Sequence, residues 1–301
     1  MRPRKKPAGA MPHGVARAFA PSHMTGFFAL GKGTSYGAGI TLSKGTETSC
    51  TAKPASSGVS YYVNGRKARQ AQLRVSACAV SKYRKLFPEF FRENGLEVRH
   101  SHAFPAGFGL GTSACAALSL SLALNGLLGS PLSREKAVAI AAEADLECKC
   151  GVLGVAASAE GGFLAKSSPE SAISRLGLPK GCAIMVGLLS PISTSRVLSD
   201  RKTLARLGSE GKRAAASFFR EPTIYSLARV SNSFALGSGI AKGKAKKFLL
   251  AERQCGMAML GNTLFWVFPD MQSALLARRH HAKSFREIHV CVPEAEGARL
   301  I

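Results

Sequence analysis

The chain has 301 residues, of which 46% are hydrophobic, and this is enough to bury one large core or two closely packed ones. Lysine and arginine number 41 against 18 aspartates and glutamates, which gives a formal net charge of +23. The composition excludes a largely disordered chain, and the positive field favours anionic ligands of any size.

The longest apolar run covers residues 114–128 and is interrupted by Ser119, Ser121 and Asn125. It is too short for a membrane span, so we expect a buried helix and no membrane partner. The eight cysteines form no paired ladder and follow no secretory signal, which predicts reduced thiols in a cytoplasmic protein. Cys148 and Cys150 are spaced as metal ligands, but no second pair of Cys or His lies nearby to complete a zinc site.

Basic residues gather at 2–6, 242–247 and 278–286. No pattern typical of an RNA-binding domain accompanies these clusters. We therefore expect solvated surface, with contact to RNA as the alternative.

The first 105 residues are expected to form a basic extension, then strands, a helix and a further strand. Residues 1–15 are basic and rich in proline, glycine and alanine, which predicts a disordered basic extension. Residues 16–63 predict short strands joined by tight turns, because short β-prone runs alternate with glycine, serine and threonine. A helix is predicted over 70–94, ended by Gly95, and a strand over 96–105.

The remaining elements complete two α+β units. An apolar helix is expected to end at Leu128, a second helix follows the capping residue Ser133, and a strand covers 161–166. A strand over 182–189 opens the second unit, which continues with helices around 233–239, the segment 256–268 and a closing strand over 288–292. We place the division at the segment 178–182, which gives domains of residues 16–178 and 179–301.

Residues 105–118 read PAGFGLGTSACAAL and join the predicted strand to the apolar helix. A glycine-rich turn that enters a helix can direct backbone N–H groups at an anion, usually a phosphate. The stretch is neither a P-loop, because no Lys precedes Thr112, nor a dinucleotide fingerprint, because its glycines run G-x-G-x-G. A steric reason for the glycines is the alternative.

The stretch resembles the P-x-x-x-G-L-G-S-S-A signature of the GHMP kinase superfamily. Residues 20–45, which contain APSHMTGFFALGKGTSYGAG, resemble the opening of the archaeal pantoate kinase family. Residues 256–268 resemble the third motif of that family, a loop beside the nucleotide phosphates, and EGGFLAK and SPISTSRVL resemble its substrate-side segments.

This resemblance implies a two-domain α+β GHMP kinase fold with the nucleotide cleft between the domains. It implies transfer of the γ-phosphate of ATP, with Mg²⁺, to the terminal hydroxyl of pantoate, on the archaeal route to coenzyme A. A cytoplasmic homodimer is what the family leads us to expect, with nucleic acid as a less expected partner.

The resemblance also implies site residues. The nucleotide would be bound by Pro105, Gly107, Gly109, Leu110, Gly111, Thr112, Ser113 and Ala114. Magnesium would be bound by Ser113 and Asp145. Pantoate would be bound by His23, Thr25, Gly26, Lys166 and Thr194, with Ser113, Asp145 and Lys166 forming the catalytic set. A histidine satisfied within its loop and a solvated lysine are the alternatives for His23 and Lys166.

Three positions depart from the family. Gly154 stands where the family has the aspartate that acts as the presumed base, and a loose phosphoryl-transfer transition state asks little of such a base. Glu143 or Glu160 could replace it if a loop has shifted. Lys166 replaces an arginine and loses its two-pronged donor set, and Ala142 replaces a histidine.

Two further functions therefore stay open at this point. One is a kinase for another small hydroxy acid or alcohol, such as homoserine or mevalonate. The other is a non-catalytic relative that binds a nucleotide or RNA, which the missing acid at Gly154 and the +23 charge suggest.

Overall fold

A computed structural model gives the structure of the protein and describes residues 14–31, 34–148, 154–192 and 201–301. Nearly all of the basic extension, together with Cys150 and Thr194, lies outside the described residues. Within them, the strands form two sheets that correspond to the two predicted α+β units.

The first sheet has the strand order β12-β1-β2-β5-β3-β4, and β6 and β7 extend it beside β2. All of its neighbours are antiparallel except β3 and β5. Its strands are β1 (Val15–Leu30), β2 (Ser35–Pro54), β3 (Val59–Val63), β4 (Arg66–Ala68), β5 (Asn94–His102), β6 (Phe163–Lys166), β7 (Ser174–Leu176) and β12 (Arg299–Leu300).

The expectation of short strands with tight turns over 16–63 is wrong, because β1 and β2 form one long antiparallel hairpin. The glycines that suggested turns lie inside β2. At Gly39 a Cβ would lie 2.5 Å from the His23 ring, and at Gly45 it would collide with the backbone of Ala20. These glycines let the two strands and their side chains approach each other closely.

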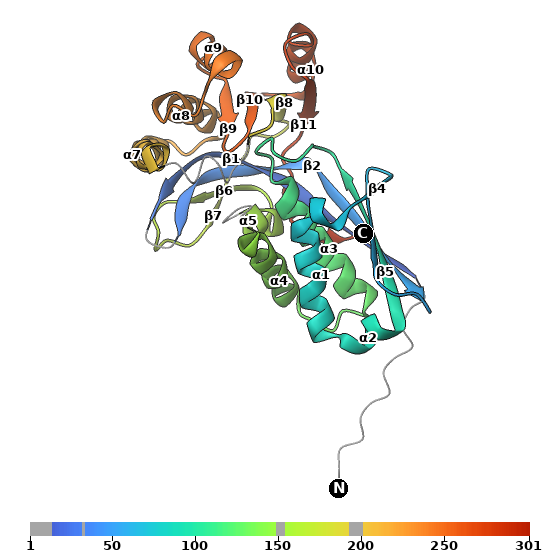
Figure 1. The fold of residues 1–301 in the computed structure, drawn as a ribbon. Helices are drawn as coiled ribbons and strands as arrows, with labels where there is room; N and C mark the ends of the chain where they lie inside the picture. Colours follow the sequence, from blue (N-terminus) through green and yellow to red (C-terminus); the bar gives the residue numbers. More distant parts are fainter. Residues whose placement is uncertain (1–13, 32–33, 149–153, 193–200) are drawn as a thin grey trace.

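Helices cover one side of this sheet, and the second unit lies on the other side (Figure 1). The predicted helix over 70–94 is wrong as one element: it divides into a 3₁₀ turn η1 (Gln70–Gln72), α1 (Arg74–Leu86) and α2 (Pro88–Glu93). The break falls at Phe87 because Pro88 disfavours helical backbone before it and cannot donate a hydrogen bond. Gly95 does not end the helix, because β5 already begins at Asn94.

Three further helices follow in this unit: α3 (Thr112–Leu127), α4 (Arg134–Glu147) and α5 (Gly154–Glu160). The predicted buried helix is confirmed, since nearly every residue of α3 is buried. The predicted cap is confirmed as well, because the Ser133 hydroxyl accepts a hydrogen bond from the Lys136 N–H. Among the described residues, no helix has the length and apolar character that crossing a membrane requires.

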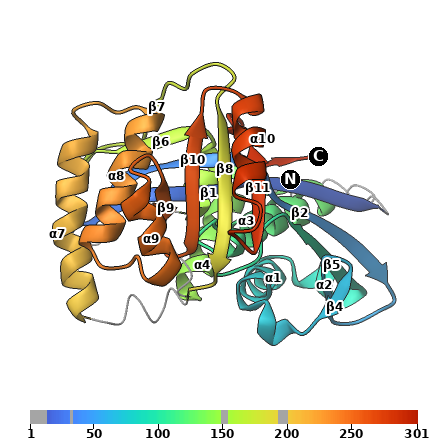
Figure 2. The ribbon, with the colours of Figure 1, turned by 90° about the horizontal axis from the view of Figure 1, so that it is seen from above.

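The second sheet has the order β11-β8-β10-β9, and α8, α9 and α10 lie over it (Figure 2). Its strands are β8 (Ala183–Ser190), β9 (Gly256–Ala258), β10 (Asn262–Phe268) and β11 (Glu287–Cys291). The accompanying helices are α7 (Arg201–Phe218), α8 (Ile224–Gly237), α9 (Gly243–Ala251) and α10 (Met271–His280).

The cores do not divide at residue 178. One buried cluster joins Met24 and Phe27 of β1 to the strands and helices of the second unit, while the other lies between the first sheet and α1, α3 and α4. The chain also returns after β11, and β12 pairs with β1. The last residues of the stretch 179–301 therefore pair with the first sheet, and the division into two domains stays a prediction.

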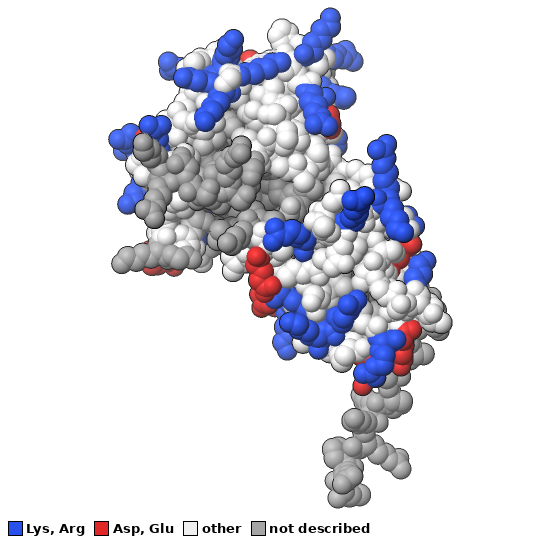
Figure 3. Space-filling model, viewed as in Figure 1, with Lys and Arg blue, Asp and Glu red and all other residues white. Residues whose placement is uncertain are grey.

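On the surface seen in Figure 3, lysine and arginine clearly outnumber aspartate and glutamate, also over the outer helices α9 and α10. Lys244, Lys246 and Lys247 are exposed on α9, and Arg278 and Arg279 are exposed at the end of α10. The predicted clusters at 242–247 and 278–286 are thus at the surface.

Candidate active site

The glycine loop (residues 103–111) connects β5 to α3 and bends through backbone conformations that favour glycine. Gly107, Gly109 and Gly111 have φ values of +86°, +74° and +70°. Gly111 is also the residue before the first turn of α3, and no side chain caps that turn. The amides at this end of α3 are therefore available to an anion.

Thr112 and Ser113 use their hydroxyl groups differently. The Thr112 hydroxyl points back into the loop and contacts the carbonyls of Phe104 and Pro105 at 3.2 and 3.3 Å. Ser113 is half-buried and lines a cavity. Thr112 can thus offer a ligand its backbone, whereas Ser113 can offer its hydroxyl.

The turn between β9 and β10 lies against the glycine loop. Gly261 packs on the backbone of Phe108, and the Thr263 hydroxyl donates to the Phe108 carbonyl at 2.8 Å. The Met259 N–H donates to the Thr25 carbonyl of β1 at 2.9 Å. The turn between β9 and β10 therefore contacts both the glycine loop and the first motif on β1, so all three segments that were singled out in the sequence meet.

A cavity of about 470 Å³ lies where these segments meet α4, α5 and β6. Most of the predicted site residues line it: His23, Thr25, Gly107, Gly109, Leu110, Gly111, Thr112, Ser113, Ala114, Asp145 and Lys166. Two predicted residues do not. Pro105 is part of the glycine loop but is not among the lining residues, and Gly26 packs on α8, where a Cβ would lie 2.6 Å from Leu227.

Asp145 is a buried carboxylate with an unsatisfied oxygen. It lies in the last turns of α4 with only 3% of its surface exposed, and its Oδ1 has no hydrogen-bond partner within the described residues. Burial raises the pKa of its carboxyl to about 6. A buried carboxylate oxygen without a partner destabilises the fold unless a cation or a hydrogen-bond donor binds it. The chemistry of Asp145 therefore fits a metal ion.

His23 is buried beside Gly39 in the middle of β1. Its Nδ1 lies 3.4 Å from the Thr25 hydroxyl, and burial lowers its pKa to about 4. The ring is therefore neutral near pH 7 and can donate or accept one hydrogen bond in the cavity.

Lys166 ends β6 opposite Gly37 of β2. Its Nζ lies 3.4 Å from the Thr34 hydroxyl, and no ion pair to it is found among the described residues. A lysine at a cavity wall without an acidic partner suits an anionic group of a ligand.

Gly154 lines the cavity at the start of α5, and a Cβ there would lie 3.1 Å from Ala114 Cβ. The alternative acids lie elsewhere. Glu143 forms an ion pair with Lys82 of α1, and Glu160 forms one with Arg175 at 3.1 Å. Neither lines the cavity, so in this arrangement the structure brings neither acid to the place of the missing base.

Ala142 is exposed on α4 and does not line the cavity either. The replacement of the family's histidine by Ala142 therefore leaves the lining of this cavity unchanged.

Sequence reasoning missed part of the lining of the cavity. Its lining includes Phe28, Leu30, Ser35, Tyr36, Ile173 and Leu204. The first four flank the β1–β2 turn, and the pairing of Ala29 with Tyr36 brings them together. These four lie within the first motif, residues 20–45, but the strand register that brings them together could not be derived from the sequence.

The comparisons with known proteins point in one direction. The family model described as "GHMP kinases N terminal domain" matches residues 75–162. The chain is 28% identical to the pantoate kinase of Methanocaldococcus jannaschii over 83% of this chain and 91% of the relative. It is 27% identical to the pantoate kinase of Thermococcus kodakarensis over 86% and 89%.

A solved structure described as "Phosphotransferase related to CoA biosynthesis pathway" superimposes with a TM-score of 0.82. It is 23% identical in sequence, and the match covers 96% of this chain and 99% of that one. The likeness supports the two-unit fold described above.

Proposed function

We propose that this chain is an ATP-dependent kinase of the GHMP family that phosphorylates the terminal hydroxyl of (R)-pantoate to give (R)-4-phosphopantoate. The observation that carries the proposal is one cavity that is lined by the start of α3, the Asp145 carboxylate and Lys166. Within the described residues, Asp145 Oδ1 has no hydrogen-bond partner and Lys166 forms no ion pair.

The part of the site that would bind ATP, the phosphate donor, is formed by backbone N–H groups. The glycine loop and the first turn of α3 would bind the ATP phosphates through N–H groups and the positive end of the helix dipole. The positive φ values at Gly107, Gly109 and Gly111 are adopted at little cost only by glycine. The loop can therefore be held in this shape before ATP arrives.

Asp145 and Ser113 would hold magnesium. The orphaned, buried Oδ1 of Asp145 fits a hard cation, and magnesium commonly binds one or two protein oxygens together with phosphates and water. When bound, the ion would neutralise charge on the transferred phosphoryl group. Asp145 would keep its proton off near pH 7 because a cation favours the carboxylate over the acid.

The acceptor side would be formed by Lys166, His23 and Thr25. Lys166 supplies the positive charge for the pantoate carboxylate, and neutral His23 supplies a hydrogen bond to a hydroxyl. Thr194, the other predicted donor, lies outside the described residues.

No dedicated base is part of this proposal. Asp145 is the one carboxylate among the described residues that line the cavity, and it is assigned to the metal. Alignment of the hydroxyl with the phosphoryl group would carry the rate, since the transition state is loose.

An acceptor panel tests the proposal. Purified protein with ATP and magnesium is given pantoate, homoserine or mevalonate, and ADP release is followed. We expect ADP release to be stimulated by pantoate above the rate with ATP alone, and abolished in Asp145→Asn. Stimulation by homoserine or mevalonate instead would assign another acceptor, and ATP binding without any stimulation would indicate a non-catalytic relative.

We also propose that the protein is a cytoplasmic homodimer, on the resemblance alone. Light scattering of the eluting protein would give twice the mass of 31.7 kDa for a dimer, and the single mass would contradict it.

A further inference from the structure

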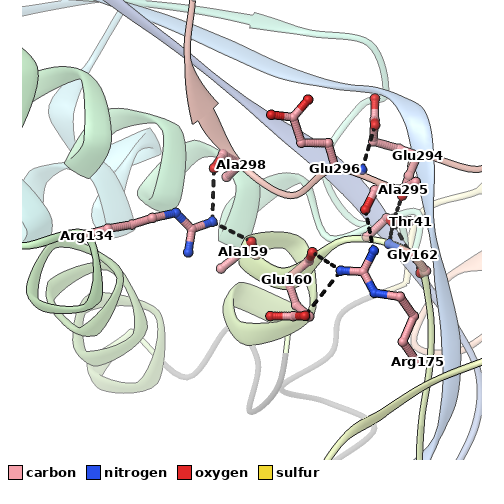
Figure 4. A network of polar contacts seen from close by, with 10 residues as sticks. All are labelled: Thr41, Arg134, Ala159, Glu160, Gly162, Arg175, Glu294, Ala295, Glu296 and Ala298. Carbon is pink, nitrogen blue, oxygen red and sulfur yellow. Dashed lines mark hydrogen bonds and ion pairs between the residues drawn. The ribbon is translucent and has the colours of Figure 1, made fainter.

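The end of the chain crosses from the second unit to the first and contacts the wall of the cavity from behind. Residues 292–301, which we call the C-terminal strap, run past β2, β6 and α5 before β12 joins β1 (Figures 1 and 4). The Ala298 N–H donates to the Ser158 carbonyl at 2.9 Å, and the Gly162 N–H donates to the Glu294 carbonyl at 2.7 Å.

The contacts converge on the corner where α5 ends and β6 begins. The Thr41 hydroxyl of β2 donates to the Glu294 carbonyl at 2.6 Å and thereby joins strap, β2 and corner (Figure 4). Gly161 and Gly297 make the close approach possible, because a Cβ at either would collide with the backbone of the opposite segment. The strap is therefore fitted to the corner at backbone level.

Two arginines hold the same corner. Arg134, the first residue of α4, donates from Nη2 to the carbonyls of Ala159 at 2.6 Å and Ala298 at 3.1 Å. Arg175 of β7 donates from Nη1 to the Ala295 carbonyl at 2.7 Å and from Nη2 to the Glu160 carbonyl at 2.9 Å (Figure 4). Each guanidinium thus bridges the strap to α5.

These donors satisfy the carbonyls at the C-terminal end of α5, which have no partners within the helix. A helix of seven residues has little stability of its own, and cations at its C-terminal end are favourable. The position of α5 therefore depends on the strap and on Arg134 and Arg175.

The corner supports the part of the cavity where the acceptor would bind. Gly154 and Ala157 on α5 line it, and Leu164, Ala165 and Lys166 follow directly on β6. The glycine loop is fixed separately, through the turn between β9 and β10.

We propose that the C-terminal strap, with Arg134 and Arg175 as positioning residues, sets the place of α5 and Lys166 and so determines acceptor affinity without affecting ATP affinity. This inference rests on the proposed function for the identity of the acceptor.

The test compares Arg175→Ala, Arg134→Ala and their lysine counterparts with the control Arg213→Ala. Arg213 also pairs with a glutamate, but it is 78% exposed on α7 and does not line the cavity. We expect the KM for pantoate to rise about tenfold in the alanine variants, because misplacement of a binding group is costly, with the KM for ATP within about twofold. The lysine variants should be intermediate, since lysine keeps the charge but loses the two-pronged contact.

Equal changes in both KM values, or no change in either, would overturn the proposal. Hydrogen exchange supplies a second readout that needs no acceptor: amides of residues 156–166 should exchange faster in Arg175→Ala, while those of α3 keep the rate of the unmodified protein. Unchanged exchange at the corner would also overturn it. If the unmodified protein ignores pantoate, the proposed function fails, but the exchange experiment still decides the role of the strap. If Arg134→Ala does not fold, the lysine variants carry the test.

Discussion

At the scale of single residues, the sequence predicted which residues belong to the site better than it predicted what surrounds each side chain. The glycines at 107, 109 and 111 could be assigned a backbone role because few other residues adopt a positive φ. By contrast, the unsatisfied Oδ1 of Asp145 depends on what packs around α4, and no sequence pattern reports that. Gly26 was assigned to the substrate because it belongs to a motif, yet it packs on Leu227.

Asp145→Asn should remove turnover and stabilise the protein in the absence of metal. The folded-state pKa of about 6 lies above the unfolded value, so the protonated acid is the form that the fold favours. Stability from this group is present below the unfolded pKa and is lost as the pH rises through about 6. A shift of this size corresponds to roughly 2–3 kcal/mol.

Urea unfolding at pH 5 and at pH 7.5 measures this effect. The gain from Asp145→Asn should be larger at the higher pH, and added magnesium should stabilise the unmodified protein but not the variant. A variant less stable than the unmodified protein at pH 7.5 would contradict the account of an unpaired buried carboxylate.

Gly154→Asp tests whether the cavity keeps room for the missing base. The nearest atom to a new Cβ would be Ala114 Cβ at 3.1 Å, so a small shift accommodates the side chain. We expect kcat to rise by about tenfold, less than the roughly hundredfold or more that a positioned base typically contributes, because a loose transition state asks little of a base. Gly154→Asn, which has the same shape without the basicity, is the matched control, and an equal rate in both variants would show that the added acid takes no proton.

At the scale of elements, local signals identified helices more reliably than strand lengths. The cap at Ser133 and the apolar character of residues 114–128 led to α4 and α3 because both features act within a few residues. The long β1–β2 hairpin was missed because its stability comes from pairing between distant residues, and its glycines imitate turns. The break of the helix at Phe87 could have been predicted from Pro88 but was overlooked.

Gly109→Ala should disturb the joint between the glycine loop and the turn from β9 to β10. Its φ of +74° strains any other residue, and a Cβ would lie 2.7 Å from the Met259 carbonyl oxygen. We expect a loss of about 1–3 kcal/mol in stability and a higher KM for ATP. Gly177→Ala, which has open space around it, is the control in thermal unfolding and kinetics, and equal stability of the two variants would contradict this role.

At the scale of the whole molecule, the two units cannot be separated by one cut in the sequence. The buried cluster that joins Met24 and Phe27 to the second unit, and the return of β12 to β1, both link residues far apart in the chain. Composition and motif order predicted two α+β units, but contacts between distant segments carry no local signal. The net charge of +23 follows directly from the sequence, and the structure places part of the basic residues on outer helices such as α9.

The basic surface of α9 should be separable from catalysis. Reversing three exposed charges, Lys244→Glu, Lys246→Glu and Lys247→Glu together, should weaken retention on RNA at low salt and leave kcat unchanged. Binding of the unmodified protein to RNA should fall steeply by about 150 mM salt, as for any basic surface. Tight, sequence-selective RNA binding at that salt would contradict the interpretation as solvated surface.

The most direct test of the central claim is to identify the product. The protein is incubated with ATP, magnesium and (R)-pantoate, and the products are analysed by ³¹P NMR and mass spectrometry, with Asp145→Asn as the control. We predict one phosphoryl group on the terminal hydroxyl of pantoate for each ADP released, and none with the variant. Release of ADP that does not depend on pantoate, or a phosphoryl group on any other atom, would contradict it.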